Sequence, residues 1–87
     1  MRERRSKDRI ILEVLSICAD GENITRIVYR ANTNFTTIRA YLDMLIKNGL
    51  VEPLQQGSPV LYKTTQKGIQ VRNRLKMLQE ELEVISL

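Results

Sequence analysis

The amino-acid sequence predicts a mainly α-helical domain with a small β-hairpin (α+β), and three observations support this fold class. Apolar residues recur at helical spacing through the first half of the chain, up to Ile46. Two short runs of strand-forming residues then flank a turn that contains Gly57 and Pro59, a pattern typical of a hairpin. From Gln66 almost to the C-terminus, the spacing of apolar residues predicts one long helix.

The composition is that of one small globular domain. The chain has 87 residues, of which 43% are hydrophobic and 28% charged, so a modest core is expected rather than disorder. Its formal net charge of +4 and pI of about 9.6 favour polyanionic partners. The sequence contains neither a signal-peptide pattern nor an apolar run of the ~20 residues that would span a bilayer. We therefore expect a cytoplasmic location.

The first helix is expected from the N-cap Ser6 to about Cys18, after a basic arm over residues 1–6. Asp20 and Gly21 end it, because glycine adopts left-handed backbone at little cost. Cys18 is the only cysteine, and we expect a small buried apolar residue there; a reactive thiol is the alternative. The apolar face of this helix is expected to contain Ile10, Ile11, Val14, Leu15 and Cys18.

Two further helices are expected, one over residues 24–31 and one over residues 35–48. Asn23 and Asn34 are the predicted N-caps, and Asn32 is predicted to make the tight turn between the helices because asparagine tolerates left-handed backbone. Asn48 and Gly49 end the second of them. The core side of the two helices is expected to contain Ile24, Ile27, Val28, Ala31, Ile38, Leu42, Leu45 and Ile46.

The hairpin should pair residues 50–54 with residues 60–64, with Pro53 marking an edge strand. Thr65 then caps the last helix, which at ~1.5 Å per residue is about 30 Å long and exceeds what a compact domain can cover. Its apolar residues repeat every 3.5 residues, like the seam of a coiled coil; this seam is formed by Val71, Leu75, Leu78, Leu82 and Ile85. We expect the seam to bind a partner helix; the alternative is packing only on the chain's own first helix.

This order of elements is that of a winged helix-turn-helix followed by a long C-terminal helix. We expect a winged DNA-binding domain over residues 1–65 and a dimerisation helix over residues 66–87. Several segments resemble archaeal winged-helix DNA-binding proteins that dimerise through an antiparallel coiled coil; they are residues 25–29, 31–32, 41–45, 49–51 and 62–68. The resemblance extends over nearly the whole chain, although the last helix is short for that family and ends in Glu80, Glu81 and Glu83.

The resemblance implies archaeal origin, duplex DNA as partner, a homodimer through the C-terminal helix, no cofactor, and a nucleoid-associated role in transcription regulation or chromatin. The third helix would enter the major groove with its N-terminal half nearest the bases. The candidate DNA-contacting residues on that helix are Asn34, Thr36, Thr37, Arg39 and Ala40. Further contacts, mainly to phosphates, are expected from Thr25, Arg26, Tyr29 and Arg30, from Gln55, Gln56, Ser58 and Lys63, and from Arg2, Arg4, Arg5 and Lys7 of the arm.

Three other classes of function are alternatives to DNA binding. A protein-interaction module would use the seam and the acidic helix end, with the positive charge incidental. Binding of single-stranded RNA needs exposed aromatic side chains, and we expect most of the following to be buried: Tyr29, Phe35, Tyr41 and Tyr62. An enzyme is not expected, because the chain lacks histidine, a glycine-rich phosphate loop and any metal-spaced cysteine or histidine set.

Overall fold

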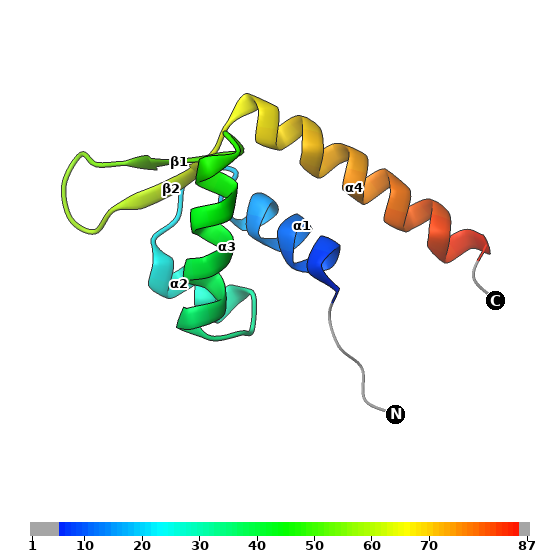
Figure 1. Ribbon diagram of the computed structural model, residues 1–87, viewed down its shortest axis with the longest axis horizontal. Coiled ribbons are helices and arrows are strands. Elements are labelled where there is room, and N and C mark those ends of the chain that lie inside the picture. Colours follow the sequence, from blue (N-terminus) through cyan, green and yellow to red (C-terminus); the bar gives the residue numbers. More distant parts are fainter. Residues whose placement is uncertain (1–5, 86–87) are drawn as a thin grey trace.

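The computed structural model describes residues 6–85, which form four helices and one antiparallel hairpin (Figure 1). The elements are α1 (Lys7–Ile17), α2 (Ile24–Arg30), α3 (Phe35–Lys47), β1 (Val51–Leu54), β2 (Leu61–Thr64) and α4 (Gln66–Ile85). This confirms the predicted fold class and the predicted order of elements. The arginines of the arm lie outside the described residues. Among the described residues, none of the helices is long and apolar enough to cross a membrane.

Local hydrogen bonds fix where the first three helices begin. Ser6 Oγ accepts the backbone N–H of Arg9 at 3.1 Å, and Asn23 Oδ1 accepts that of Arg26 at 3.0 Å. Asn34 Oδ1 accepts the backbone N–H of Thr37 at 2.8 Å. Each bond satisfies an N–H group that the first helical turn leaves unpaired, so the three predicted caps are confirmed. Asn32 makes the tight turn, as predicted, with a φ of 55°.

The core lies between α1, α2 and α3, and the hairpin closes it. Its buried residues are Val14, Leu15, Cys18, Ile27, Ala31, Ile38, Leu42, Leu45, Val51 and Tyr62. Cys18 is completely buried, as predicted for a small apolar residue. Thr64 is also buried, and its hydroxyl donates a hydrogen bond to the Leu15 carbonyl at 2.8 Å. This bond joins the end of β2 to α1 and leaves the buried hydroxyl satisfied.

A third segment of the chain pairs with the hairpin, which the sequence did not predict. Glu22, between α1 and α2, pairs with Tyr62 of β2: its N–H donates to the Tyr62 carbonyl at 3.1 Å, and its carbonyl accepts the Tyr62 N–H at 2.8 Å. On the other side of β2, Pro53 lies opposite Tyr62. Because both backbone polar groups of Tyr62 are directed to Glu22, the missing N–H of Pro53 costs no bond with Tyr62.

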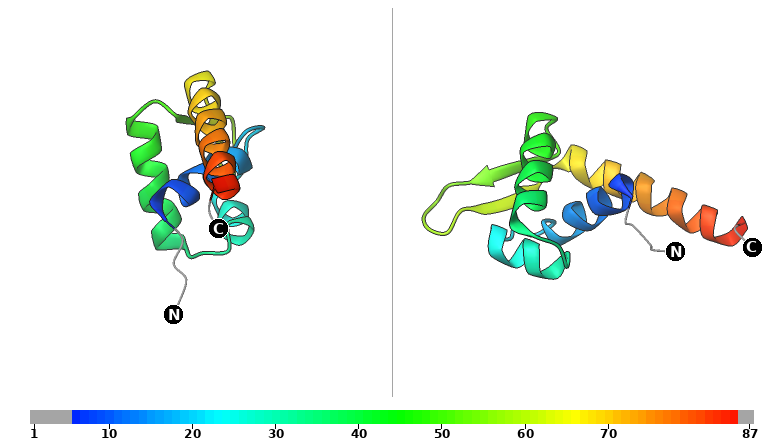
Figure 2. Two further views of the ribbon diagram at one scale, coloured as in Figure 1. Left: turned by 90° about the vertical axis from the view of Figure 1, so that its right-hand side faces the viewer. Right: turned by 60° about the horizontal axis from the view of Figure 1, so that its bottom comes forward.

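The start of α4 is fixed against the α3–β1 connection. Thr65 Oγ1 accepts the backbone N–H of Gly68 at 3.0 Å and donates to the Gly49 carbonyl at 2.6 Å. Gly68 is buried, and a Cβ atom there would collide with the Leu50 carbonyl oxygen and lie 2.6 Å from Thr64 Cγ2. From this anchor, α4 runs alongside α1, and its second half extends past the rest of the chain (Figures 1 and 2).

The expectation that most aromatic residues are buried was wrong for two of the four. Tyr62 is buried and Tyr41 half-buried, but the side chains of Tyr29 and Phe35 are 85% and 56% exposed. Tyr29 lies off the apolar face of α2, a helix of only seven residues. Phe35 is the first residue of α3, where no preceding helical turn covers its ring.

Candidate nucleic-acid interface

The outer face of α3 begins with small side chains and continues with the exposed Asp43 and Lys47. Thr36 and Ala40 are exposed one turn apart, on the side of the helix opposite the buried Ile38, Leu42 and Leu45. In the left view of Figure 2, α3 forms one side of the molecule, and no other element lies outside it. A helix with such a slim exposed face can approach the base edges of a major groove closely.

Arg39 lies at the edge of this face and is held within the protein. Its Nε and Nη2 donate to Asp43 Oδ1 at 3.2 and 2.9 Å, and its Nη1 donates to the Tyr62 hydroxyl at 3.2 Å. The bond to Tyr62 and the pairing with Asp43 raise the pKa of Arg39, which therefore keeps its positive charge. The structure thus directs this arginine sideways, towards β2.

The Glu22 carboxylate forms ion pairs with both arginines of α2. Glu22 Oε2 lies 3.4 Å from Arg26 Nε, and Glu22 Oε1 lies 3.3 Å from Arg30 Nη1. The Glu22 side chain is mostly buried, whereas both arginines are exposed and keep donors available to solvent. Thr25 and Tyr29 are also exposed on α2. Phosphate-binding side chains are therefore available on this helix, partly neutralised by Glu22.

The remaining candidates come from the wing, residues 51–64, and from the start of α1. Gln55, Gln56 and Ser58 are exposed in the loop of the wing, and Lys63 is exposed on β2 opposite Glu52. Arg2, Arg4 and Arg5 lie outside the described residues. Lys7 is exposed and lines a shallow hollow of about 220 Å³ with Ala40, Tyr41 and Met44 of α3. This contact between the start of α1 and the outer side of α3 had no signal in the sequence.

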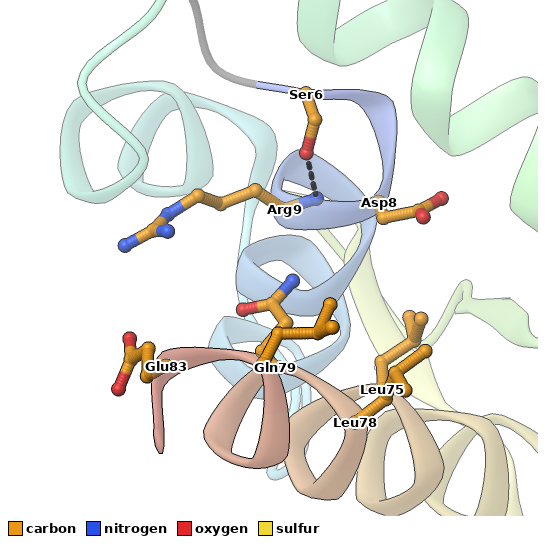
Figure 3. A pocket seen from close by; sticks show the side chains of 8 residues that line it. Ser6, Asp8, Arg9, Leu75, Leu78, Gln79 and Glu83 are labelled. Carbon is orange, nitrogen blue, oxygen red and sulfur yellow. Dashed lines mark hydrogen bonds between the residues drawn. The ribbon is translucent and has the colours of Figure 1, made fainter. Parts of the chain in front are cut away.

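The seam of α4 divides into two parts. Val71 packs against the core and Leu75 is half-buried, so the first part is covered by the chain itself. Leu78, Leu82 and Ile85 are 49%, 51% and 69% exposed. A groove of about 310 Å³ lies between this second part and the start of α1 (Figure 3); its lining residues are Ser6, Asp8, Arg9, Leu75, Leu78, Gln79, Leu82 and Glu83. Packing against the same chain therefore covers only the first part of the seam.

Among residues 6–85, no group of three or more histidine, cysteine, aspartate or glutamate side chains is arranged to hold a metal ion. The features that do stand out are a slim helix face, flanking basic side chains and an exposed wing. A family model described as winged helix-turn-helix matches residues 4–83. The chain belongs to the winged helix-turn-helix family.

Other comparisons agree with this assignment to the winged helix-turn-helix family and confirm the resemblance to archaeal members. A stretch of 52 residues, 59% of this chain, is 42% identical to an uncharacterised protein from Methanocaldococcus jannaschii, of which it spans only 54%. The fold is similar to that of Sso10a-2, a DNA-binding protein from Sulfolobus solfataricus, with a TM-score of 0.86 and 27% identity over 93% of this chain and 85% of that one.

The fold is also similar to a regulator with a larger chain. Sco5413, a MarR family transcriptional regulator from Streptomyces coelicolor, aligns with a TM-score of 0.75 and 19% identity over 84% of this chain and 54% of that chain. At this level of identity the likeness concerns the fold alone. The winged helix-turn-helix fold of this chain is thus one that known transcription regulators also use.

Proposed function

We propose that the protein is a homodimer that binds duplex DNA, with α3 in the major groove and the wing against the sugar–phosphate backbone. The observation that carries this proposal is the exposed face of α3, where Thr36 and Ala40 are bordered by the basic side chains of Arg39 and Lys7. Small side chains permit close approach to base edges, and cations at the border of the face can neutralise phosphates. The similarity of the fold to that of Sso10a-2, a DNA-binding protein, supports the same function.

The phosphate contacts in this proposal come from three places. Arg26 and Arg30 on α2 are exposed, Lys63 is exposed on the wing, and Lys7 lies at the start of α1. The arm with Arg4 and Arg5 is a further contributor, which deletion of residues 1–5 tests. Such contacts position the protein on the duplex and make binding sensitive to salt.

Dimerisation in this proposal uses the exposed second part of the seam. A single α4 leaves Leu78, Leu82 and Ile85 in water, and a second copy of the helix would bury them. Two copies would then present two α3 helices to one duplex, as dimeric helix-turn-helix proteins do. We propose a role in transcription regulation or chromatin on the nucleoid, with no cofactor and no enzymatic activity.

The test is a titration of a fluorescent random-sequence duplex at several salt concentrations, with the protein's mass measured by light scattering. A dimer whose affinity falls steeply with salt is the expected result, because each neutralised phosphate releases a counterion. Arg39→Glu should reduce the affinity at least about tenfold. Lys76→Glu makes the same charge change at an exposed position of α4 and serves as the matched control, expected to bind normally.

One observation favours a second function, a protein-docking module. The exposed part of the seam lies beside the acidic end of α4, where Glu80, Glu81 and Glu83 are all exposed. A basic, apolar partner helix would complement this surface. Absence of duplex binding even at low salt would overturn DNA binding and favour this alternative.

A further inference from the structure

We infer that α3 recognises the C5-methyl groups of thymine, so that the protein prefers duplexes rich in A·T pairs through apolar contacts in the major groove. This inference rests on the proposed DNA binding and specifies its substrate class. The bases that α3 can recognise depend on which side chains of its exposed face are free to contact a base edge, and on the kind of contact that each can make.

The two side chains best suited to hydrogen-bond purines are already engaged. Asparagine recognises adenine through its carbonyl and amino groups together, but the Asn34 carbonyl oxygen accepts the Thr37 N–H at 2.8 Å. Arginine recognises guanine with two parallel N–H groups. Three N–H groups of Arg39, out of the five that a guanidinium has, are directed to Asp43 and Tyr62. Either recognition would have to compete with contacts within the protein.

Apart from Asp43, which pairs with Arg39, the groups exposed on α3 before Lys47 are apolar or carry a methyl group. Thr36 and Ala40 are exposed, and Met44 is half-buried on the same face one turn further along. The ring of Phe35, which is 56% exposed, lies at the start of the helix. Alanine, the threonine methyl and phenylalanine are the side chains that meet the thymine methyl in major grooves.

The hollow beside Ala40 gives this apolar face a recess. Ala40, Tyr41 and Met44 line it together with Lys7, and its volume is about 220 Å³. From Thr36 to Met44 the face extends for about 12 Å along the helix, at ~1.5 Å per residue. With bases spaced about 3.4 Å apart along one strand, this length covers roughly three or four base pairs. Several thymine methyl groups can therefore lie against the face at once, with the Lys7 ammonium near a phosphate.

The direct test compares an alternating dA–dT duplex with an alternating dA–dU duplex, which differ only in the C5-methyl groups. We expect binding to the uracil duplex to be weaker by about fourfold for each methyl group that the protein buries. The converse comparison uses an alternating dG–dC duplex with and without 5-methylcytosine, where adding the methyl group should tighten binding. Both comparisons are made with the full chain at one fixed salt concentration.

Two variants of Thr36 separate methyl contact from DNA shape. Thr36→Ser removes the methyl group and keeps the hydroxyl, so its thymine-to-uracil affinity ratio should fall towards one. Thr36→Val keeps methyl groups and loses the hydroxyl, so its ratio should remain that of the unaltered protein. Thr36 is exposed, so neither variant disturbs the core.

The outcomes distinguish the inference from the proposed function. Equal affinity for the thymine and uracil duplexes would overturn methyl recognition while leaving DNA binding intact. A thymine preference that Thr36→Ser leaves unchanged would overturn the assignment of methyl recognition to the Thr36 side chain. Failure to bind any of the four duplexes at low salt would instead overturn DNA binding itself.

Discussion

The guanidinium carbon of Arg39 lies 5.5 Å from the centre of the Tyr62 ring, and Nη1 of Arg39 donates a hydrogen bond to the Tyr62 hydroxyl at 3.2 Å. These two residues come from α3 and from the wing, 23 positions apart in the chain. Tyr62 is itself fixed, because its side chain is buried and its backbone pairs with Glu22. The pair therefore couples the position of the proposed recognition helix to that of the wing.

Tyr62→Phe tests the hydrogen-bonded part of this coupling. The variant keeps the ring and its contact with the cation but removes the hydroxyl group. We expect the free energy of unfolding to fall by about 0.5–1 kcal/mol, because one hydrogen bond to a partly exposed charged group is lost. Urea denaturation measures this change. Tyr29→Phe is the matched control, since the Tyr29 side chain is 85% exposed; an equal loss in that variant would contradict the prediction.

Asp43→Asn should strengthen DNA binding. The substitution removes a negative charge from the exposed side of α3 and weakens the hold on Arg39 of its closest partner, Asp43 Oδ1 at 2.9 Å, because a neutral amide oxygen accepts less strongly than a carboxylate. The Arg39 guanidinium then interacts more strongly with a phosphate, so the slope of log K against log salt should steepen by up to about 0.9. Stability should fall by only about 0.5 kcal/mol, as for an exposed pair one turn apart on a helix.

The control for Asp43→Asn is Glu80→Gln, which removes the same charge from the exposed end of α4. It should leave the affinity and the salt slope nearly unchanged. If Asp43→Asn weakened binding, Asp43 would be needed to hold Arg39 in its binding orientation, and the opposite prediction would be correct.

Gly68→Ala should destabilise the fold. A Cβ atom at this position would collide with the Leu50 carbonyl oxygen and crowd Thr64 Cγ2 at 2.6 Å, and backbone cannot move aside as a flexible side chain can. We expect a loss of about 2–3 kcal/mol in the free energy of unfolding, typical of overpacking. Gln70→Ala, at an exposed position of the same helix, should change it by no more than about 0.5 kcal/mol. Equal stability of the two variants would contradict the close approach of α4 to Leu50.

Cys18 should make stability depend on alkaline pH. Burial raises the pKa of its thiol from 9.0 to about 12, with Glu22 adding to the rise and Arg30 opposing it. The folded protein therefore holds this proton more tightly than the unfolded chain. The resulting stabilisation is complete below pH 9 and is lost as the pH rises towards 12.

Urea denaturation between pH 8 and about 10.5 measures this effect, and Cys18→Ala should show a shallower decline of unfolding free energy with pH than the unaltered protein. The native thiol should also resist alkylation at pH 8 and react once urea unfolds the chain. Rapid alkylation of the native protein would contradict the burial of Cys18.

The elements were predictable from the sequence because their signals are local. Ser6, Asn23 and Asn34 each bond an N–H group three residues ahead, so a cap can be recognised from a few neighbouring residues. The contacts that shape the candidate interface are not local. Tyr62 pairs with the backbone of Glu22 and accepts a hydrogen bond from Arg39. Both contacts depend on how the wing packs against the helices.

Exposure was harder to predict than helical phase. Phe35 belongs to an apolar residue type, but its place at the first residue of α3 leaves its ring exposed. Exposure along the seam of α4 was equally hard to predict, because its apolar residues are evenly spaced in the sequence but differ in how far they are buried. Val71 is covered by the core and Ile85 is 69% exposed, a difference set by where α1 begins.

Leu78→Lys should weaken the proposed dimer, because it places a charge in the exposed part of the seam. We expect the dimer dissociation constant to rise about 10- to 100-fold, because the two half-exposed Leu78 side chains of a dimer together lose ~1.5–3 kcal/mol of apolar burial. The adjacent Met77 is 60% exposed but lies off the seam, so Met77→Lys adds the same charge without that loss. Light scattering over a range of protein concentrations measures both. Dissociation by Met77→Lys alone would place the dimer contact on the opposite face of α4, whereas a monomeric unaltered protein would overturn the proposed dimer.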